Sequence, residues 1–377
     1  MREFFASTWT LRQHYIHLLM TNSVKTSSST AGRLRHIPKV ELHRHLECSF
    51  RISTLRDLAP AAGLDAPSDD NELKRKLLIT EPSPDLESAL VKFLATQKLL
   101  HCEENLTRLT FEAIEDAANE GIRILELRFA PTYAQLNHAH LSFEKIHRAI
   151  AKGVEQAKHL PIAVGLIVII QRTTPLEVAA KVTDFAIANS GKKTGEIIAL
   201  DLADSEAGFQ PRPFAPLFAK AKKAGLHITV HSGEADVPEA AGYVREAIEL
   251  LGAERIGHGV QIYKDPLVMK FVADQRVPLE LCPTSNWLTS AVRSTALHPF
   301  RFLMEKGLLV TLNSDDPGVF DIDLTNEYDV LEREHGFTAA EFERINDIAA
   351  SASFIPLEIK QKHWPRQIDC SLAPLSN

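Results

Sequence analysis

His43 and His45 lie in the first short apolar segment of this chain and are separated by a single residue. In a β-strand, residues i and i+2 point to the same face, so both imidazoles could bind one metal ion while Arg44 points away. Later apolar segments also end in metal-binding side chains, among them His231 and Asp315. Zinc prefers imidazole and carboxylate ligands and makes hydroxide available near neutral pH. These residues therefore indicate a metal site that activates water, although iron or cobalt also accepts such ligands.

Further polar side chains follow the same segments. Glu234 lies three residues after His231, where a carboxyl group beside a metal ligand is suited to general acid or base catalysis. His258 stands between two glycines and could orient or deprotonate the metal-bound water. Asp316 directly follows Asp315, and both carboxylates can reach one pocket if the chain turns there. The alternative for Glu234 is a carboxylate in a solvated loop. The alternative for His258 is a histidine with a purely structural role.

One metal ion per chain is expected rather than two. Barrel hydrolases with two metals often bridge their ions with a modified lysine at the end of the fourth strand. The corresponding segment, residues 199–206, contains no lysine. Cysteine ligands are not indicated either, because the four cysteines, Cys48, Cys102, Cys282 and Cys370, form no CxxC pair.

Eight short apolar segments would have to position these side chains. They lie at residues 40–47, 123–130, 162–170, 197–202, 227–231, 255–260, 277–282 and 308–313. They are rich in Val, Ile and Leu without polar alternation, as expected of parallel strands buried on both faces. Amphipathic stretches separate them, and a glycine suited to a left-handed helix end precedes several: Gly121, Gly225, Gly252 and Gly307. This order predicts a closed (β/α)8 barrel of TIM type, with the site at the carboxyl ends of the strands.

An open, doubly wound sheet is the alternative architecture. Such a sheet would more often carry a glycine-rich phosphate-binding turn after its first strand, and none is visible here. Between the first two strands, residues 86–100 and 106–118 have helical spacing, which predicts a helical cap over the barrel mouth. Residues 1–34 are expected to be a disordered extension, and residues 35–377 a single catalytic domain.

The composition narrows the class of ligand. The chain has 377 residues and a net charge of −7, which argues against nucleic-acid binding and favours a small-molecule partner. No apolar stretch is long enough to span a membrane, and the N-terminal segment lacks the apolar core of a secretory signal. With its scattered cysteines, the chain is expected to be cytoplasmic. The sequence does not indicate an oligomeric state.

Taken together, the motifs resemble those of the adenosine deaminase family of metal-dependent barrel hydrolases. The matching segments are PKVELHRHLE at 38–47, ELRFAP at 126–131, VHSGE at 230–234, ERIGHGV at 254–260, CPTSN at 282–286 and NSDDP at 313–317. They occur in the order found in the family and span most of the chain. Residues 86–100 also resemble the gate over the purine pocket of that family.

The resemblance implies hydrolytic deamination of a purine nucleoside, adenosine or also 2′-deoxyadenosine, to inosine (or its deoxy form) and ammonia. One Zn²⁺ per chain would be held by His43, His45, His231 and Asp315, and its hydroxide would attack C6 of the purine. By the same resemblance, Glu234 protonates N1, His258 positions the water and Asp315 takes part in catalysis as well as in metal binding. Substrate contacts are implied for His45, Glu47, Asp204 and Asp316, with Asp316 at N7. Asp201 and Ser285 would orient the metal ligands.

Three positions depart from the family pattern. Cys48 replaces a usual glycine, and Glu47 stands where animal enzymes have an aspartate. Asp204 replaces a glycine whose N–H meets purine N3, so the group on purine N9 stays open. The alternative substrates are adenine, aminodeoxyfutalosine or an N6-substituted purine. A non-catalytic purine-binding module would be expected to lack a ligand or the acid, and a cytidine-deaminase type would need a CxxC pair.

Overall fold

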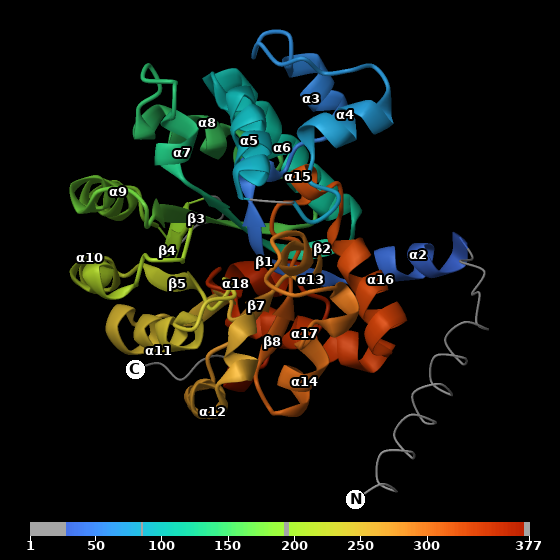
Figure 1. Cartoon of the computed structure of the whole chain (residues 1–377), viewed down its shortest axis with the longest axis vertical. Coiled ribbons are helices and arrows are strands. Elements are labelled where there is room, and N and C mark those ends of the chain that lie inside the picture. Colours follow the sequence, from blue (N-terminus) through green and yellow to red (C-terminus); the bar gives the residue numbers. More distant parts are fainter. Residues whose placement is uncertain (1–27, 84–85, 192–195, 373–377) are drawn as a thin grey trace, which may run out of the picture.

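The computed structural model describes residues 28–83, 86–191 and 196–372, and in these ranges eight parallel strands form one sheet in chain order (Figure 1). Backbone hydrogen bonds between Asp315 and β1 join the last strand to the first: the Asp315 N–H donates to the His43 oxygen (3.1 Å), and the His45 N–H to the Asp315 oxygen (2.8 Å). The predicted (β/α)8 barrel is confirmed. The strands are β1 Lys39–His45, β2 Ile122–Phe129, β3 Ala163–Gln171, β4 Ile197–Ala203, β5 His227–Ser232, β6 Arg255–His258, β7 Leu279–Leu281 and β8 Val310–Leu312.

Helices surround the barrel and cover the outer faces of the strands. The α-helices of the outer layer and of the C-terminal part are α6 Glu103–Asn119, α8 Phe143–Gln156, α9 Leu176–Ala188, α10 Ala215–Lys223, α11 Ala240–Leu251, α12 Pro266–Gln275, α14 Phe300–Glu305, α16 Leu324–His335, α17 Ala339–Ala352 and α18 Leu357–His363. Short α-helices follow three strands: α7 Pro131–Gln135, α13 Pro283–Leu288 and α15 Pro317–Phe320. Single 3₁₀ turns are η1 Leu46–Cys48, η2 Lys98–Leu100, η3 Arg212–Phe214, η4 Val260–Lys264, η5 Thr295–Leu297 and η6 Cys370–Leu372.

The four glycines predicted at helix ends all have positive φ, from +70° to +93°. At Gly121 the close approach of the backbone adds a second requirement. A Cβ atom there would lie 2.8 Å from the Arg35 oxygen and 3.0 Å from the Ile37 oxygen. Both constraints favour glycine, because only glycine tolerates the conformation and the contact together.

The inserted helices lie at the carboxyl end of the barrel. They are α3 Ile52–Leu58, α4 Asp70–Leu77 and α5 Leu86–Gln97, and Figure 1 shows them on the same side as α7 and α15. The rings of Phe93 on α5 and Phe320 on α15 pack edge to face at 6.4 Å, and the Tyr133 hydroxyl donates to the Phe93 oxygen at 2.7 Å. A cap formed by these helices over the barrel mouth, and its action as a gate, stay predictions.

The predicted N-terminal extension differs from the structure over its last residues. Residues 28–34 belong to helix α2, Ser28–Arg35, and Leu34 is completely buried. Arg35 forms an ion pair with Asp323 at 2.6 Å, which also fixes the helix to the barrel. Helix α2 therefore extends across the predicted boundary at residue 34, because a buried leucine and an ion pair stabilise a helix in a segment of polar composition. Residues 1–27 lie outside the described residues.

Among the described residues, no helix has the length and apolar character needed to cross a bilayer.

Candidate metal centre and active site

Four predicted metal ligands meet at the carboxyl end of the barrel. His43 and His45 end β1, His231 lies in β5, and Asp315 follows β8. Asp315 Oδ1 lies 3.2 Å from Nε2 of His43 and 3.2 Å from Nε2 of His45, and the Nε2 atoms of His45 and His231 are also 3.2 Å apart. A tetrahedral zinc site with bonds of about 2.0–2.1 Å places neighbouring donor atoms about 3.3 Å apart. The spacing therefore fits one ion.

The hydrogen bonds around these donors also fit a cation. His43 Nδ1 contacts Glu280 at 2.8 Å and His231 Nδ1 contacts Asp201 at 3.0 Å, so each Nδ1 carries the proton and each Nε2 offers a lone pair. Among the described residues, the buried atoms His43 Nε2 and Asp315 Oδ1 have no hydrogen-bond partner. Buried polar atoms normally have partners, so a bound cation would explain both.

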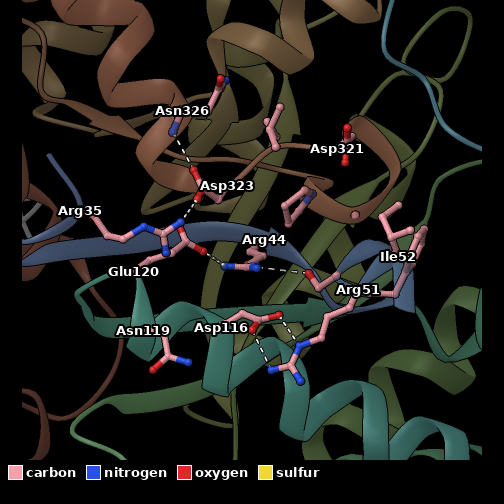
Figure 2. Close-up of a pocket in the computed structure, with 15 residues that line it drawn as sticks. Arg35, Arg44, Arg51, Ile52, Asp116, Asn119, Glu120, Asp321, Asp323 and Asn326 are labelled. Atoms are coloured by element: carbon pink, nitrogen blue, oxygen red, sulfur yellow. Dashed lines mark hydrogen bonds and ion pairs between the residues drawn. The ribbon is translucent and has the colours of Figure 1, made fainter. Parts of the chain in front are cut away.

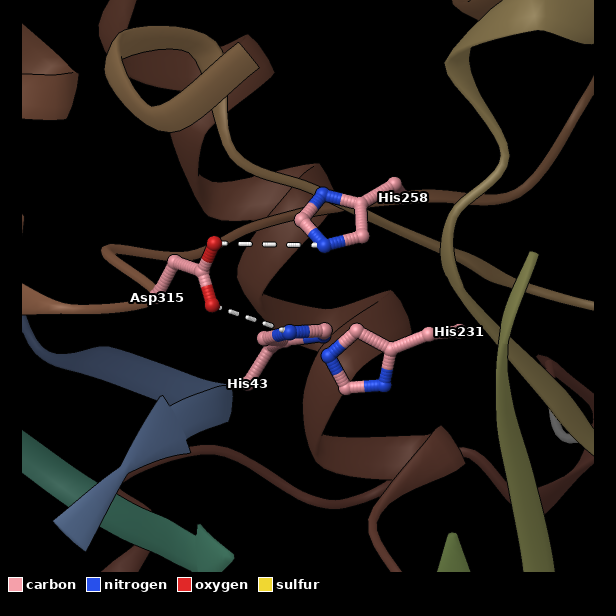
Figure 3. Close-up of side chains that lie close together, drawn as sticks. All are labelled: His43, His231, His258 and Asp315. Atoms are coloured by element: carbon pink, nitrogen blue, oxygen red, sulfur yellow. Dashed lines mark ion pairs between the residues drawn. The ribbon is translucent and has the colours of Figure 1, made fainter. Parts of the chain in front are cut away.

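His258 lies beside this group but faces a different oxygen. Its Nε2 is 3.9 Å from Asp315 Oδ2 (Figure 3) and 3.6 Å from Glu234 Oε2. The donor atoms of His43, His231, His258 and Asp315 all lie within 4.8 Å of one another, so a set including His258 is a geometric alternative. The short 3.2 Å contacts favour His45 over His258 as the ligand, and they leave His258 beside the space for water.

The backbone is strained where the site is built. Asp315 and His258 have φ of +64° and +59°, a conformation that costs a residue with a side chain about 1–3 kcal/mol. Two backbone bonds to β1 and the Ser314 N–H, which donates to Glu41 at 2.9 Å, hold the Asp315 turn. Gly257 provides space for His43, because a Cβ there would lie 2.8 Å from His43 Cε1. The strained turn aims the Asp315 carboxylate at the histidines.

Glu234 occupies the turn after β5, and a second carboxylate holds that turn. Glu206 accepts the backbone N–H groups of Gly233 (2.7 Å), Glu234 (3.0 Å) and Ala235 (3.1 Å). The pKa of Glu234 is raised to about 8, mainly by burial and secondly by the negative charge of Asp315. Glu234 therefore retains its proton at neutral pH and can act as a general acid.

His258 is oriented by an amide. The Asn286 side chain lies 3.1 Å from His258 Nδ1 and 3.0 Å from His298 Nε2. When the Asn286 amide donates to Nδ1, the neutral His258 ring carries its proton on Nε2, toward Glu234 and Asp315. Burial lowers the pKa of His258 well below its usual value, which favours this neutral form.

The residues predicted to bind substrate have different contacts within the protein. Burial is the main cause, and the negative charge of Asp315 the second, that raises the pKa of Asp316 to about 6. The Asp316 carboxylate also accepts a hydrogen bond from the Cys48 thiol. Glu47 is buried, and its carboxylate accepts the Ala130 N–H at 2.5 Å. Contact of these residues, and of His45, with substrate stays a prediction.

Asp204 takes the conformation expected of the glycine that it replaces, with φ of +80°. Its carboxylate accepts hydrogen bonds from the Thr173 hydroxyl (2.5 Å) and the Gln171 amide (3.3 Å). The side chain is therefore tied to the segment that follows β3. The backbone at this position can keep the course that a glycine would give it, although aspartate pays a conformational cost.

Two predicted orienting residues contact the predicted metal ligands directly. Asp201 contacts His231, and the Ser285 hydroxyl donates to Asp315 Oδ2 at 2.7 Å. Four residues that were not predicted also support the site: Arg128, Glu206, Glu280 and Asn286. For Glu280 the sequence carries a signal, since a charged residue within a short buried strand is rare unless it is paired.

A cavity of about 640 Å³ lies outside the barrel, behind the end of β1 (Figure 2). Arg44 is among the residues that line it, as Figure 2 shows. The arginines that line the cavity are each paired with carboxylates, so we assign it no substrate. The pairs are Arg35–Asp323, Arg44–Glu120 and Arg51–Asp116.

Comparison with known proteins gives consistent results. A family model described as "Adenosine deaminase" matches residues 38–366. Adenosine deaminases of Yersinia enterocolitica and Serratia proteamaculans are 36% and 37% identical over 327 residues, which cover 86% of this chain and 96% of each relative. Among solved structures, the adenine deaminase of Arthrobacter aurescens is 28% identical with a TM-score of 0.77, covering 86% of this chain and 96% of that chain. The N6-methyl-AMP deaminase of Arabidopsis thaliana is 28% identical with a TM-score of 0.75, covering 88% and 96%.

Proposed function

Because this chain belongs to the adenosine deaminase family, we propose that it hydrolyses adenosine, and 2′-deoxyadenosine, at purine C6. The products are inosine, or its deoxy form, and ammonia. The observation that carries the proposal is the convergence of His43, His45, His231 and Asp315 on one point beside a protonated Glu234. Residues 35–377 would act as a single catalytic domain.

The proposed cofactor is one zinc ion per chain. The family is metal-dependent, and the buried cluster of histidines and aspartate fits a metal ion. When bound, zinc lowers the pKa of water toward neutrality and so supplies hydroxide. The imidazole and carboxylate donors favour zinc among the common hard and soft cations.

The residues around this cluster have distinct proposed roles. Glu234 donates its proton to purine N1, which makes C6 electrophilic. His258 directs its Nε2 toward the space between Glu234 and Asp315, where it orients the attacking water. Purine N7 is a hydrogen-bond acceptor, so Asp316 must donate to it. Its pKa, raised to about 6, makes the protonated form that this contact needs more accessible than for an ordinary aspartate.

A second substrate remains open because of Asp204. The Arthrobacter structure is named for adenine and the Arabidopsis structure for N6-methyl-AMP, so related folds carry out related reactions. The Asp204 side chain bears on the choice between these substrates. The Thr173 hydroxyl holds it, so it is not free to fill the pocket. We therefore favour a nucleoside over the free base. The cytoplasmic location inferred from the cysteines also stays a prediction.

A substrate panel tests the proposal. Purified zinc-loaded protein is incubated with adenosine, adenine, AMP and N6-methyl-AMP, and the deaminated purines are quantified by chromatography. We expect kcat/KM for adenosine to exceed that of each other substrate by at least about tenfold. The variant Asp204→Gly should keep this preference. Faster turnover of adenine or N6-methyl-AMP would retain the chemistry but overturn the proposed substrate.

A further inference from the structure

A series of charged side chains crosses the barrel interior beneath the metal-binding histidines. Arg128 on β2 donates to Asp201 on β4 at 2.8 Å and to Glu280 on β7 at 2.7 Å. Asp201 contacts Nδ1 of His231, and Glu280 contacts Nδ1 of His43. One guanidinium group therefore links the two carboxylates that orient two of the proposed metal ligands.

The same guanidinium also holds the strand that carries two ligands. Its second terminal nitrogen donates to the Leu42 oxygen at 2.6 Å, immediately before His43. Arg128 is completely buried, as are Asp201 and Glu280. These contacts join β1, β4 and β7 through one side chain of β2.

A second arginine extends the series without touching Asp201. Arg255 donates to Glu280 and to Glu126, each at 2.6 Å, and its guanidinium lies 3.6 Å from the centre of the Phe354 ring. With Asp315 included, the buried charged groups are two guanidinium groups, of Arg128 and Arg255, and four carboxylates, of Glu126, Asp201, Glu280 and Asp315. A divalent cation at the histidines would neutralise their net charge, which agrees with the proposed metal centre.

We propose that Arg128 is a positioning residue for the metal centre, holding Asp201 and Glu280 at the separation that aims His231 and His43 at one ion. The inference rests on the proposed function. The planar fork of arginine can hold two carboxylates in fixed directions, whereas a lysine ammonium acts as a single point charge. Apolar layers usually fill a barrel of this kind, and buried ion pairs are often replaceable without loss of stability. An ionic layer directly below the ligands therefore indicates a role in orienting them.

The test compares Arg128→Lys with the matched control Arg301→Lys. Arg301 likewise contacts a carboxylate, Glu341 at 2.8 Å, and a backbone oxygen, that of His335 at 2.6 Å, but it lies away from the metal ligands. Zinc affinity is measured by competition with a chromophoric chelator, and ligand geometry by the visible absorption of the cobalt-substituted protein. We expect Arg128→Lys to weaken zinc binding by about 10–100-fold and to alter the cobalt spectrum. The control should change neither.

A second variant keeps the test decisive if Arg128→Lys does not fold. Asp201→Asn removes the charge from one end of the link and should weaken zinc binding to a similar degree. Wild-type zinc affinity and an unchanged cobalt spectrum in the folded Arg128→Lys protein would overturn the inference, whatever its activity. Failure of the wild type to deaminate any purine would instead refute the proposed function, and the zinc titration would still decide the role of Arg128.

Discussion

Replacing Glu234 by glutamine should lower kcat for adenosine by about 10²–10⁴-fold while zinc remains bound. The glutamine amide has the size of the carboxyl group but cannot give a proton to purine N1. Glu234 does not belong to the group of donor atoms that lie 3.2 Å apart, so the metal should stay. The measurement is steady-state kinetics together with the zinc content of the purified variant.

The control is Glu239→Gln, the same substitution at an exposed position of the same loop. Its kcat should equal that of the wild type. The pKa of about 8 for Glu234 also predicts that the wild-type rate falls as pH rises through that value, because the acid loses its proton. Substantial turnover by Glu234→Gln would contradict the assignment of Glu234 as the acid.

Replacing His43 by alanine should abolish stable zinc binding and, with it, deamination. The change removes a donor atom that is buried and without a hydrogen-bond partner among the described residues. Zinc that binds only the native state would stabilise it by about 4 kcal/mol at a free concentration 1,000 times its Kd. A chelator should therefore lower the Tm of the wild type and leave that of the variant unchanged. Metal analysis and thermal unfolding measure both effects.

His227→Ala is the matched control for this experiment. His227 is the first residue of β5, at the end of the barrel opposite the site, where it pairs with Glu254 at 2.9 Å and stacks on Phe354. Its loss should leave zinc content and activity unchanged. A His43→Ala protein that retained one equivalent of zinc would show that His43 is not a ligand.

The barrel could be predicted from the sequence because its signals are local. Both faces of the strands are buried, so they appear as continuous apolar segments, and the observed strand ends lie within a few residues of the predicted ones. Likewise, the i, i+2 spacing of His43 and His45 in one strand placed both imidazoles on one face. The positive φ of Gly121 and Gly252 follows from a single residue type at a helix end.

Most of the support beneath the site could not be predicted in the same way. The resemblance implied a role for Asp201, but the contacts of Arg128 with Asp201 and Glu280 join three different strands and depend on barrel registers that no short motif reveals. The left-handed conformation of Asp204 could not be predicted from the sequence, because aspartate rarely adopts it without support. Here hydrogen bonds from Thr173 and Gln171 provide that support. Helix α2 was missed because its stabilising contacts lie far away in sequence, as with Arg35 and Asp323.

The central claim is that His43, His45, His231 and Asp315 hold a metal on which adenosine deamination depends. The most direct measurement is ammonia release from adenosine by chelator-treated protein, before and after addition of one equivalent of zinc. We predict negligible release from the stripped protein and recovery of the initial rate after zinc is added. Undiminished release from protein shown to be free of metal would contradict the account.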